Sequence, residues 1–335
     1  EEVKIVIHLT DWNAVPPHSY KSAQTGAKMK DIVMEAKDLT KKYKEAVVLD
    51  HINLQLEKGK IYGFIGRNGA GKTTFLRLIT GLAFPTCGTL ALWGKSGTQE
   101  LQTQRKRIGC MIETPALFPS LCAHQNMEVQ RLQRGIPDKT VIDKCLHMVH
   151  LEDTGKKAVR NFSLGMRQRL GIAAALLNMP EFLILDEPIN GLDPAGIAEI
   201  RNLLKHLNQE YGMTILISSH ILEELSHTAS QFILIEKGKI MEELSDSELK
   251  ERCRQHIAIK SADPQNTLLI LEDKLQTDNL QLMPDGMIRL YDHLENMEQV
   301  AHILMESHIL VTELHLSGDT LEDYFLRRVG GYSHD

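Results

Sequence analysis

The stretch "GRNGAGKT", from Gly66 to Thr73, decides the fold. It follows a strand-like run, "KIYGFI", and opens a helix-like one, "TFLRLITGL". A glycine-rich turn between a strand and a helix can aim backbone N–H groups at phosphate oxygens, and the helix adds its positive N-terminal end. The spacing therefore predicts a phosphate-binding loop, in which Lys72 reaches the β and γ phosphates of a nucleotide and Thr73 offers a hydroxyl to Mg²⁺. We expect the nucleotide to contact Gly66, Arg67, Asn68, Gly69, Ala70, Gly71, Lys72, Thr73 and Thr74.

A second element, "FLILDEP" at 182–188, places four apolar residues before two acids. Two adjacent acids could merely end a strand. In open α/β sheets, however, ligands bind at the carboxyl ends of the strands, and this strand follows a P-loop in the same chain. We therefore predict that Asp186 holds Mg²⁺ through water and that Glu187 polarises an attacking water.

Short β-branched runs alternate with helical stretches from Met29 to about Ser245. This alternation predicts βαβ units around a buried, largely parallel sheet, and so an α/β fold. Between about Thr114 and Asn161 the apolar spacing approaches 3.6 residues, which predicts a helical subdomain at 114–161 inside a nucleotide-binding domain at 29–245.

The remainder, 246–335, reads as strand, helix, two strands joined by "PDG", helix and strand, followed by a closing helix. The order βαββαβ predicts a small ferredoxin-like α+β accessory domain. Residues 1–28 are rich in polar and turn residues and lack the pattern of a signal peptide. We expect Met29 to be the natural start and 1–28 to be an added or fused extension; a native regulatory arm is the alternative.

The composition excludes several classes of protein. Apolar residues make up 42% and charged residues 24%, and the formal net charge is -6, which gives no electrostatic reason to bind nucleic acid. The most apolar long stretch is interrupted by Asn178, Pro180 and Glu181, so it falls short of the roughly 20 apolar residues that span a bilayer. The five scattered cysteines form no Cys-x-x-Cys pair and indicate reduced thiols.

Five motifs in order make the chain resemble the nucleotide-binding subunit of ATP-binding cassette (ABC) transporters, from Met29 to about Ser245. After Tyr43 in "KKYKEAVV" come the P-loop, "FSLGMRQR" at 162–169, "LILDE", "GLDP" at 191–194 and the "ISSH" that ends in His220. The resemblance implies an ATPase with Mg²⁺ as cofactor.

The resemblance also implies a homodimer formed on ATP binding, because family members sandwich two ATP molecules between two protomers. Tyr43 would stack on adenine, and Ser163 and Gly165 would meet the γ-phosphate held by the second copy. His220 would touch the γ-phosphate and the attacking water, and Asp193 would work across the dimer seam. The run at 162–166, "FSLGM", corresponds to the signature motif of the family, which is usually Leu-Ser-Gly-Gly-Gln. This chain has Phe162, Leu164 and Met166 at the first, third and fifth positions of that motif.

Glu113 in "IETPALFP" stands where this family usually has a Gln that reaches Mg²⁺ and the attacking water. The substitution resembles the branch that exports bacitracin or lantibiotic peptides for self-immunity or resistance. We expect Glu113 to be a catalytic and metal-binding residue beside Asp186 and Glu187; a solvated strand end is the plain alternative.

The leading hypothesis is an ATP-hydrolysing subunit, cytoplasmic and peripheral on the inner face of the membrane. It would drive a separate transmembrane permease to expel a peptide antibiotic. A nucleotide-gated dimerisation module with little turnover is the alternative, because the altered signature weakens polar contacts. A cassette ATPase of DNA repair or translation would need a long coiled coil or two cassettes, and the sequence has neither.

Overall fold

The computed structural model of this chain describes residues 31–318 and 321–330. The description below concerns the compact unit that begins at Ile32. The predictions made for residues 1–28 lie outside the described residues.

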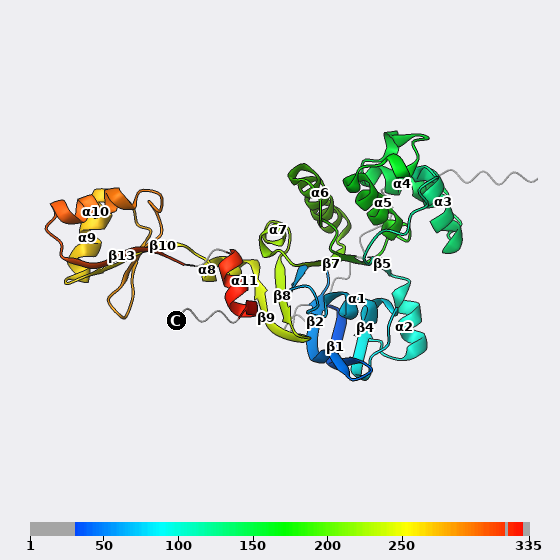
Figure 1. The fold of residues 1–335 in the computed structure, drawn as a ribbon, viewed down its shortest axis with the longest axis horizontal. Coiled ribbons are helices and arrows are strands. Elements are labelled where there is room, and N and C mark those ends of the chain that lie inside the picture. The colour runs from blue at the N-terminus through cyan, green and yellow to red at the C-terminus, as the bar shows by residue number, and fades with distance from the viewer. Residues whose placement is uncertain (1–30, 319–320, 331–335) are drawn as a thin grey trace, which may run out of the picture. The chain divides into compact units, whose positions relative to one another are not determined.

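A six-stranded sheet forms the centre of the part from 32 to 245 (Figure 1). Its strand order is β5-β6-β7-β3-β8-β9, and every pair is parallel except β8 with β9. The bounds are β3 Ile61–Ile65, β5 Ile108–Met111, β6 Phe182–Asp186, β7 Thr214–Ser219, β8 Gln231–Glu236 and β9 Lys239–Ser245. Strands β3, β6 and β7 are buried at every position, which explains their continuous apolar sequence. The predicted α/β fold with a largely parallel sheet is confirmed.

A second, antiparallel sheet has the order β2-β1-β4, with β1 Ile32–Tyr43, β2 Ala46–Glu57 and β4 Cys87–Leu92. Residues of this sheet share one buried cluster with helix α1, Lys72–Thr80, and with one face of the six-stranded sheet. Phe64 of β3 and Phe75 of α1 are fully buried there, with ring centroids 5.2 Å apart. The P-loop helix is therefore fixed by packing against both sheets. Helix α2 spans Thr98–Arg105.

The other face of the six-stranded sheet carries the helices that the sequence predicts between 114 and 161, together with those that follow. These are α3 Ala123–Gln133, α4 Thr140–Met148, α5 Leu164–Leu176, α6 Pro194–Tyr211 and α7 Leu222–Ser226, with 3₁₀ turns at Glu152–Thr154 and Val159–Asn161. Their apolar residues form one cluster with those of the sheet. None of the helices in 31–318 and 321–330 is long and apolar enough to be a membrane span.

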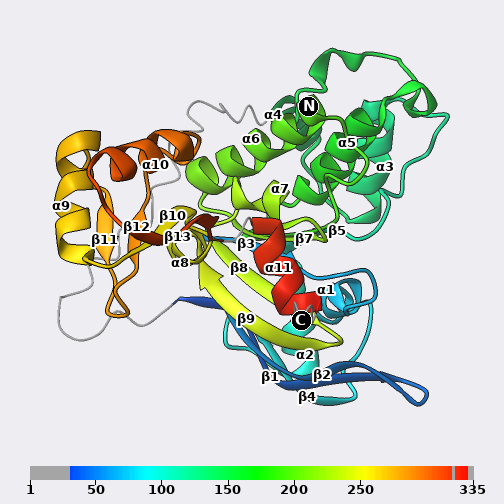
Figure 2. The same ribbon diagram turned by 60° about the vertical axis from the view of Figure 1, so that its left-hand side comes forward.

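The C-terminal part has the predicted βαββαβ order. After α8, Asp246–Arg252, come β10 His256–Ser261, α9 Pro264–Leu275, β11 Leu280–Leu282, β12 Ile288–Leu290, α10 Met297–Glu306 and β13 Val311–Ser317. The four strands pair antiparallel in the order β11-β12-β10-β13 and bury their own apolar cluster with α9 and α10. The last helix, α11 Leu321–Gly330, lies beside α7 instead (Figures 1 and 2).

Two glycines let α5 lie directly on β5. A Cβ on Gly109 of β5 would lie 2.3 Å from the carbonyl oxygen of Ala175 in α5. A Cβ on Gly171 of α5 would lie 2.6 Å from the Sδ of Met111. Neither position has room for a side chain, so this approach fixes α5 and the segment after β5 relative to the sheet.

We expect Gly109→Ala to lower the free energy of unfolding by about 1–3 kcal/mol, because the new methyl group meets backbone atoms that cannot move aside. Denaturant unfolding of the full chain measures this loss. Gly97→Ala is the control, since its Cβ would approach only the end of the flexible Glu100 side chain, and we expect a smaller loss there. Equal unfolding midpoints for Gly109→Ala and the parent would contradict the close approach.

Candidate functional site

The loop 66–71 joins the end of β3 to the start of α1, as the sequence predicts. Gly69 and Gly71 have φ values of 84° and 111°, which glycine adopts at little cost. No side chain caps α1. Because the N–H groups of a first helical turn have no intrahelical partners, they and the positive end of the helix dipole are available to a phosphate group.

A pocket of about 210 Å³ lies at this loop. It is lined by Val48, Arg67, Asn68, Gly69, Gly71, Lys72, Thr73, Thr74 and Glu187. Seven of the nine predicted P-loop residues and Glu187 therefore surround one space, and Gly66 and Ala70 belong to the same loop without lining it. Tyr43 is not among the lining residues: its ring is 44% exposed at the end of β1, with the Lys41 ammonium 4.6 Å from the ring centroid.

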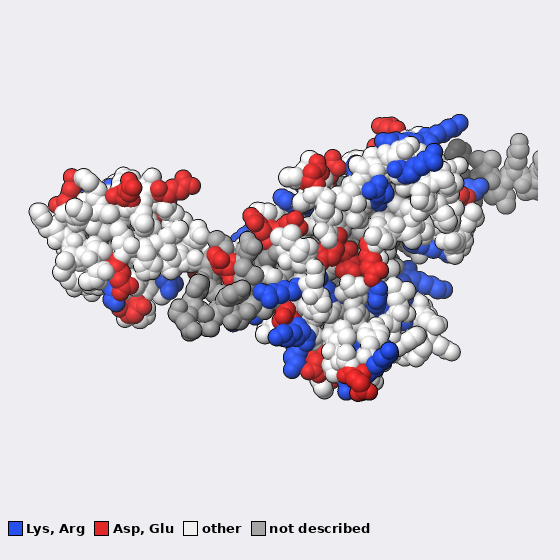
Figure 3. Space-filling view, viewed as in Figure 1, with Lys and Arg blue, Asp and Glu red and all other residues white. Residues whose placement is uncertain are grey.

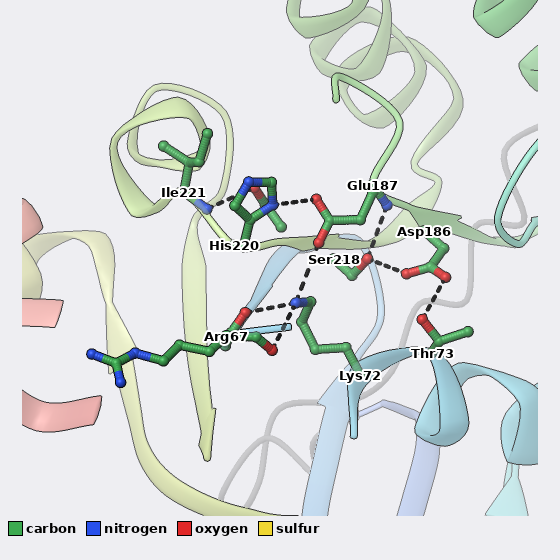
Figure 4. Close-up of polar contacts among 10 residues, drawn as sticks. Arg67, Lys72, Thr73, Asp186, Glu187, Ser218, His220 and Ile221 are labelled. Carbon is green, nitrogen blue, oxygen red and sulfur yellow. Dashed lines mark hydrogen bonds and ion pairs between the residues drawn. The ribbon is translucent and has the colours of Figure 1, made fainter. Parts of the chain in front are cut away.

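Asp186 ends β6, and its buried carboxylate meets the P-loop helix. Thr73 donates a hydrogen bond to Asp186 Oδ2 over 2.8 Å, and Ser218 of β7 donates to Asp186 Oδ1 (Figure 4). A hydroxyl and a carboxylate side by side are hard oxygen donors of the kind that Mg²⁺ prefers. The geometry thus fits the predicted metal-binding pair of Thr73 and Asp186.

Glu187 bridges a cation and a histidine (Figure 4). Its Oε1 lies 3.2 Å from Lys72 Nζ, and its Oε2 lies 2.9 Å from His220 Nδ1. Lys72 is almost fully buried, and its ammonium also donates to the carbonyl oxygens of Gly66 and Arg67 over 2.6 and 3.4 Å. The structure therefore brings Lys72, Glu187 and His220 together, as predicted.

Ser218 is a residue of this site that sequence reasoning missed. Glu187 has a φ of 49°, which strains a non-glycine backbone. Its N–H donates to Ser218 Oγ over 2.9 Å, with the Ser218 carbonyl oxygen 3.2 Å away. One hydroxyl thus holds Asp186 and the strained Glu187 together. The available signal was the "SS" before His220, because two polar residues at the end of a buried strand need partners.

The negative charge of Glu187 also affects a carboxyl group on α7, that of Glu224. Burial, and to a smaller extent the nearby Glu187, raise the pKa of Glu224, while His220 acts in the opposite direction. Ionisation of Glu224 is therefore less favourable than that of a fully solvated glutamate.

Ser163, Gly165 and Asp193 lie away from the lining of this pocket. Ser163 caps α5 by accepting a hydrogen bond from the Met166 N–H over 3.2 Å, and Asp193 caps α6 by accepting one from the Gly196 N–H over 3.1 Å. Both side chains are exposed, and a Cβ on Gly165 would make only ordinary contacts, 3.8 Å from Leu192 Cδ2 and 4.0 Å from Ser163 Oγ. Within one protomer these residues are helix starts at the surface, available to a second copy.

Glu113 does not join the other two carboxylates. It lies two residues beyond the end of β5, is 59% exposed and forms an ion pair with Arg77 of α1. Among the described residues, no group of three or more His, Cys, Asp or Glu side chains is placed to hold a metal ion. A role of Glu113 at the metal therefore requires the Arg77 pair to open, and it stays a prediction.

A phosphate cradle, an oxygen pair for a divalent cation, and a carboxylate between a lysine and a histidine define a P-loop nucleotide hydrolase. Comparison with known proteins agrees: the family model described as "ABC transporter" matches residues 49–190. The bacitracin transport ATP-binding protein BcrA of Bacillus licheniformis is 40% identical over 299 residues, which cover 89% of this chain and 98% of that protein.

The lantibiotic transport ATP-binding protein SrtF of Streptococcus pyogenes is 42% identical, over 62% of this chain and 89% of that protein. A solved dimeric ATP-binding cassette in a post-hydrolysis state, bound to ADP and Pi, matches with a TM-score of 0.58 and 28% identity, over 63% of this chain and 98% of that one. The chain belongs to the ATP-binding proteins of ABC transporters. It is an ATPase subunit related to those of bacitracin and lantibiotic transport.

We expect Ser218→Ala to lower the free energy of unfolding by about 1–3 kcal/mol and to reduce ATP turnover, because the Asp186 carboxylate and the Glu187 N–H lose a buried partner. Steady-state phosphate release and thermal unfolding measure the two effects. Ser230→Ala is the control: its hydroxyl bonds the backbone of Ile61 at the opposite end of β3, so stability should fall while turnover per folded molecule persists. Full turnover in Ser218→Ala would remove this hydroxyl from the site.

Proposed function

We propose that this chain is the ATP-hydrolysing subunit of an exporter that expels a peptide antibiotic of the bacitracin type. It would act at the inner face of the cell membrane through a separate transmembrane permease. The observation that carries the proposal is the similarity to the bacitracin relative, which extends over nearly the whole of both proteins. The match with the lantibiotic relative leaves 38% of this chain uncovered, so the bacitracin relative is the better guide to the whole chain.

In this proposal different residues of the site bind the phosphates of ATP, hold the metal ion and accept the proton. The P-loop amides and Lys72 hold the β and γ phosphates, and Thr73 and Asp186 hold Mg²⁺, which neutralises charge on the phosphate oxygens when bound. Glu187 accepts the proton of the attacking water. His220 orients the Glu187 carboxylate through the bond at 2.9 Å and faces the γ-phosphate.

A second copy completes the site in this proposal. Ser163 and Gly165 start α5 at the surface, and Asp193 starts α6, so each can reach a nucleotide held by another protomer. The exposed ring of Tyr43 offers a flat surface for adenine. Acidic and basic groups are interspersed on the face shown in Figure 3. That face has no broad basic surface of the kind that binds the phosphates of nucleic acid.

The permease would bind beside the segment that carries Glu113. A groove of about 200 Å³ lies there, lined in part by Leu82, Thr114, Pro115 and Ala116. Two of its lining residues, Leu82 at 67% and Ala116, are exposed apolar side chains. Exposed apolar side chains that gather at a groove are typical of a protein-binding surface.

We expect Glu187→Gln to keep ATP binding, to abolish most hydrolysis and to stabilise an ATP-bound dimer, because an amide cannot accept the proton of the attacking water. Phosphate release and size-exclusion chromatography with Mg-ATP measure these effects, and Glu210→Gln, an exposed acid on α6, is the control. Parental hydrolysis by Glu187→Gln would remove Glu187 from this role.

The alternative, a nucleotide-gated dimerisation module, is favoured by the altered signature, because Leu164 adds an exposed side chain at the start of α5. The same assay with the permease present separates the two functions. ATP-dependent dimers without phosphate release above the Glu187→Gln level would support the module and contradict the exporter.

We further expect Glu113→Gln to preserve folding and nucleotide binding, and to weaken both the Mg²⁺ dependence of turnover and peptide protection in cells that carry the permease. A neutral amide attracts the cation less than a carboxylate does. Arg77→Gln is the matched variant, because it frees Glu113 from its partner and should shift the Mg²⁺ dependence in the opposite direction. If Glu113→Gln matches the parent in both assays, Glu113 is a solvated strand end that pairs with Arg77.

A further inference from the structure

The C-terminal helix α11 packs against the segment that carries His220. Strand β7 ends at Ser219, His220 follows it, and α7 begins at Leu222. Helix α7 contacts β3, the strand that leads into the P-loop, and it also contacts α11 (Figure 2). The short helix behind His220 thus touches the P-loop strand and the C-terminal helix.

Two aromatic side chains anchor α11. Tyr324 and Phe325 are 5% and 6% exposed and belong to the same buried cluster as Leu225 of α7 and Ala229. A Cβ on Gly63 of β3 would lie only 3.1 Å from the Leu225 side chain, so α7 has little freedom to move inward. Outward movement of α7 is opposed by α11.

A polar cluster fixes α11 at one end of this contact. Tyr324 donates its hydroxyl proton to Glu242 Oε2 of β9 over 2.6 Å, and Arg252 NH1 donates to the Tyr324 oxygen over 2.9 Å. Arg252 also pairs with Glu242 Oε1, and Arg328 of α11 lies 3.5 Å from Glu242 Oε2. The Glu242 carboxylate therefore contacts the Tyr324 phenol and the guanidinium groups of Arg252 and Arg328.

The charges of this cluster are stable at neutral pH. Burial opposes ionisation of Glu242, yet the hydrogen bonds from Tyr324 and Arg252 hold its pKa below the usual value. Burial, and next the Glu242 carboxylate, raise the pKa of Tyr324, so the phenol keeps the proton that it donates. The cluster thus joins β9, α8 and α11 through charge-assisted hydrogen bonds.

The cluster also joins the two chain segments that enter and leave the βαββαβ domain. Arg252 ends α8, and three residues separate it from His256, where β10 begins. Three residues likewise separate Ser317, where β13 ends, from Leu321, where helix α11 begins. The chain segments on the two sides of that domain therefore meet at the Arg252–Tyr324 contact.

We propose that Tyr324 is a positioning residue for ATP hydrolysis: with Glu242 and Arg252 it holds α11 against α7, and so keeps His220 in contact with Glu187. This role rests on the function proposed above for Glu187 and His220. It gives the βαββαβ domain a means to alter turnover without contacting the nucleotide.

The test is steady-state ATP hydrolysis by the purified full chain carrying Tyr324→Phe, which keeps the buried ring and removes the hydroxyl. We expect kcat to fall by about threefold to tenfold, the effect of one lost hydrogen bond. The KM for ATP and the stoichiometry of a bound fluorescent ATP analogue should stay at parental values, because the P-loop is untouched. Tyr211→Phe, at an exposed position at the end of α6, is the control and should match the parent.

An unchanged kcat in Tyr324→Phe overturns the proposal, and so does a loss of kcat that only parallels a loss of nucleotide-binding stoichiometry. If Tyr324→Phe does not fold, Glu242→Gln is measured in its place with the same expected split between kcat and KM. His220→Ala separates the two hypotheses. If it is inactive while Tyr324→Phe is fully active, only the positioning role fails; if His220→Ala is fully active, the role proposed for His220 fails first.

Discussion

The order of strands β6, β7 and β3 in one parallel sheet is the constraint on which the rest of the structure depends. Parallel strands end at the same edge, so Asp186 at the end of β6, His220 after β7 and the P-loop after β3 meet there although they are distant in sequence. Each strand is buried on both faces, which holds the edge in place. The site is therefore carried by rigid elements, with only its phosphate cradle in a loop.

Glu187 shows how this edge is adapted to chemistry. Its backbone has a positive φ, a strained conformation that persists only where its surroundings impose it. Ser218 and the carbonyl beside it hold the Glu187 N–H, while Lys72 and His220 hold the two carboxylate oxygens. The carboxylate that would accept a proton is thus fixed from both ends. The Ser218 hydroxyl on β7 bonds both the Asp186 carboxylate and the Glu187 N–H.

Much of the fold could be predicted from the sequence, because short stretches of residues indicate the strands, helices and turns that they form. Glycines at 69 and 71 and a buried apolar run before Asp186 report backbone conformation and burial directly. The βαββαβ order followed from successive segments of 246–335 that read as strand, helix, two strands joined by "PDG", helix and strand. Ser218 was not predicted, because a serine at the end of a strand is common and its value here comes from two partners that other segments supply. The ion pair of Glu113 with Arg77 was hidden for the same reason.

The sequence by itself determined the class of site, since the spacing from Gly66 to Thr73 and the acids after β6 require a particular backbone whatever surrounds them. Only the tertiary structure decided which side chains share a carboxylate, because Lys72, Glu187 and His220 lie on three separate segments. It also decided that the last helix leaves the βαββαβ domain and packs beside α7. An amphipathic helix specifies an apolar face, whereas its partner is chosen by whichever apolar surface the rest of the chain leaves uncovered.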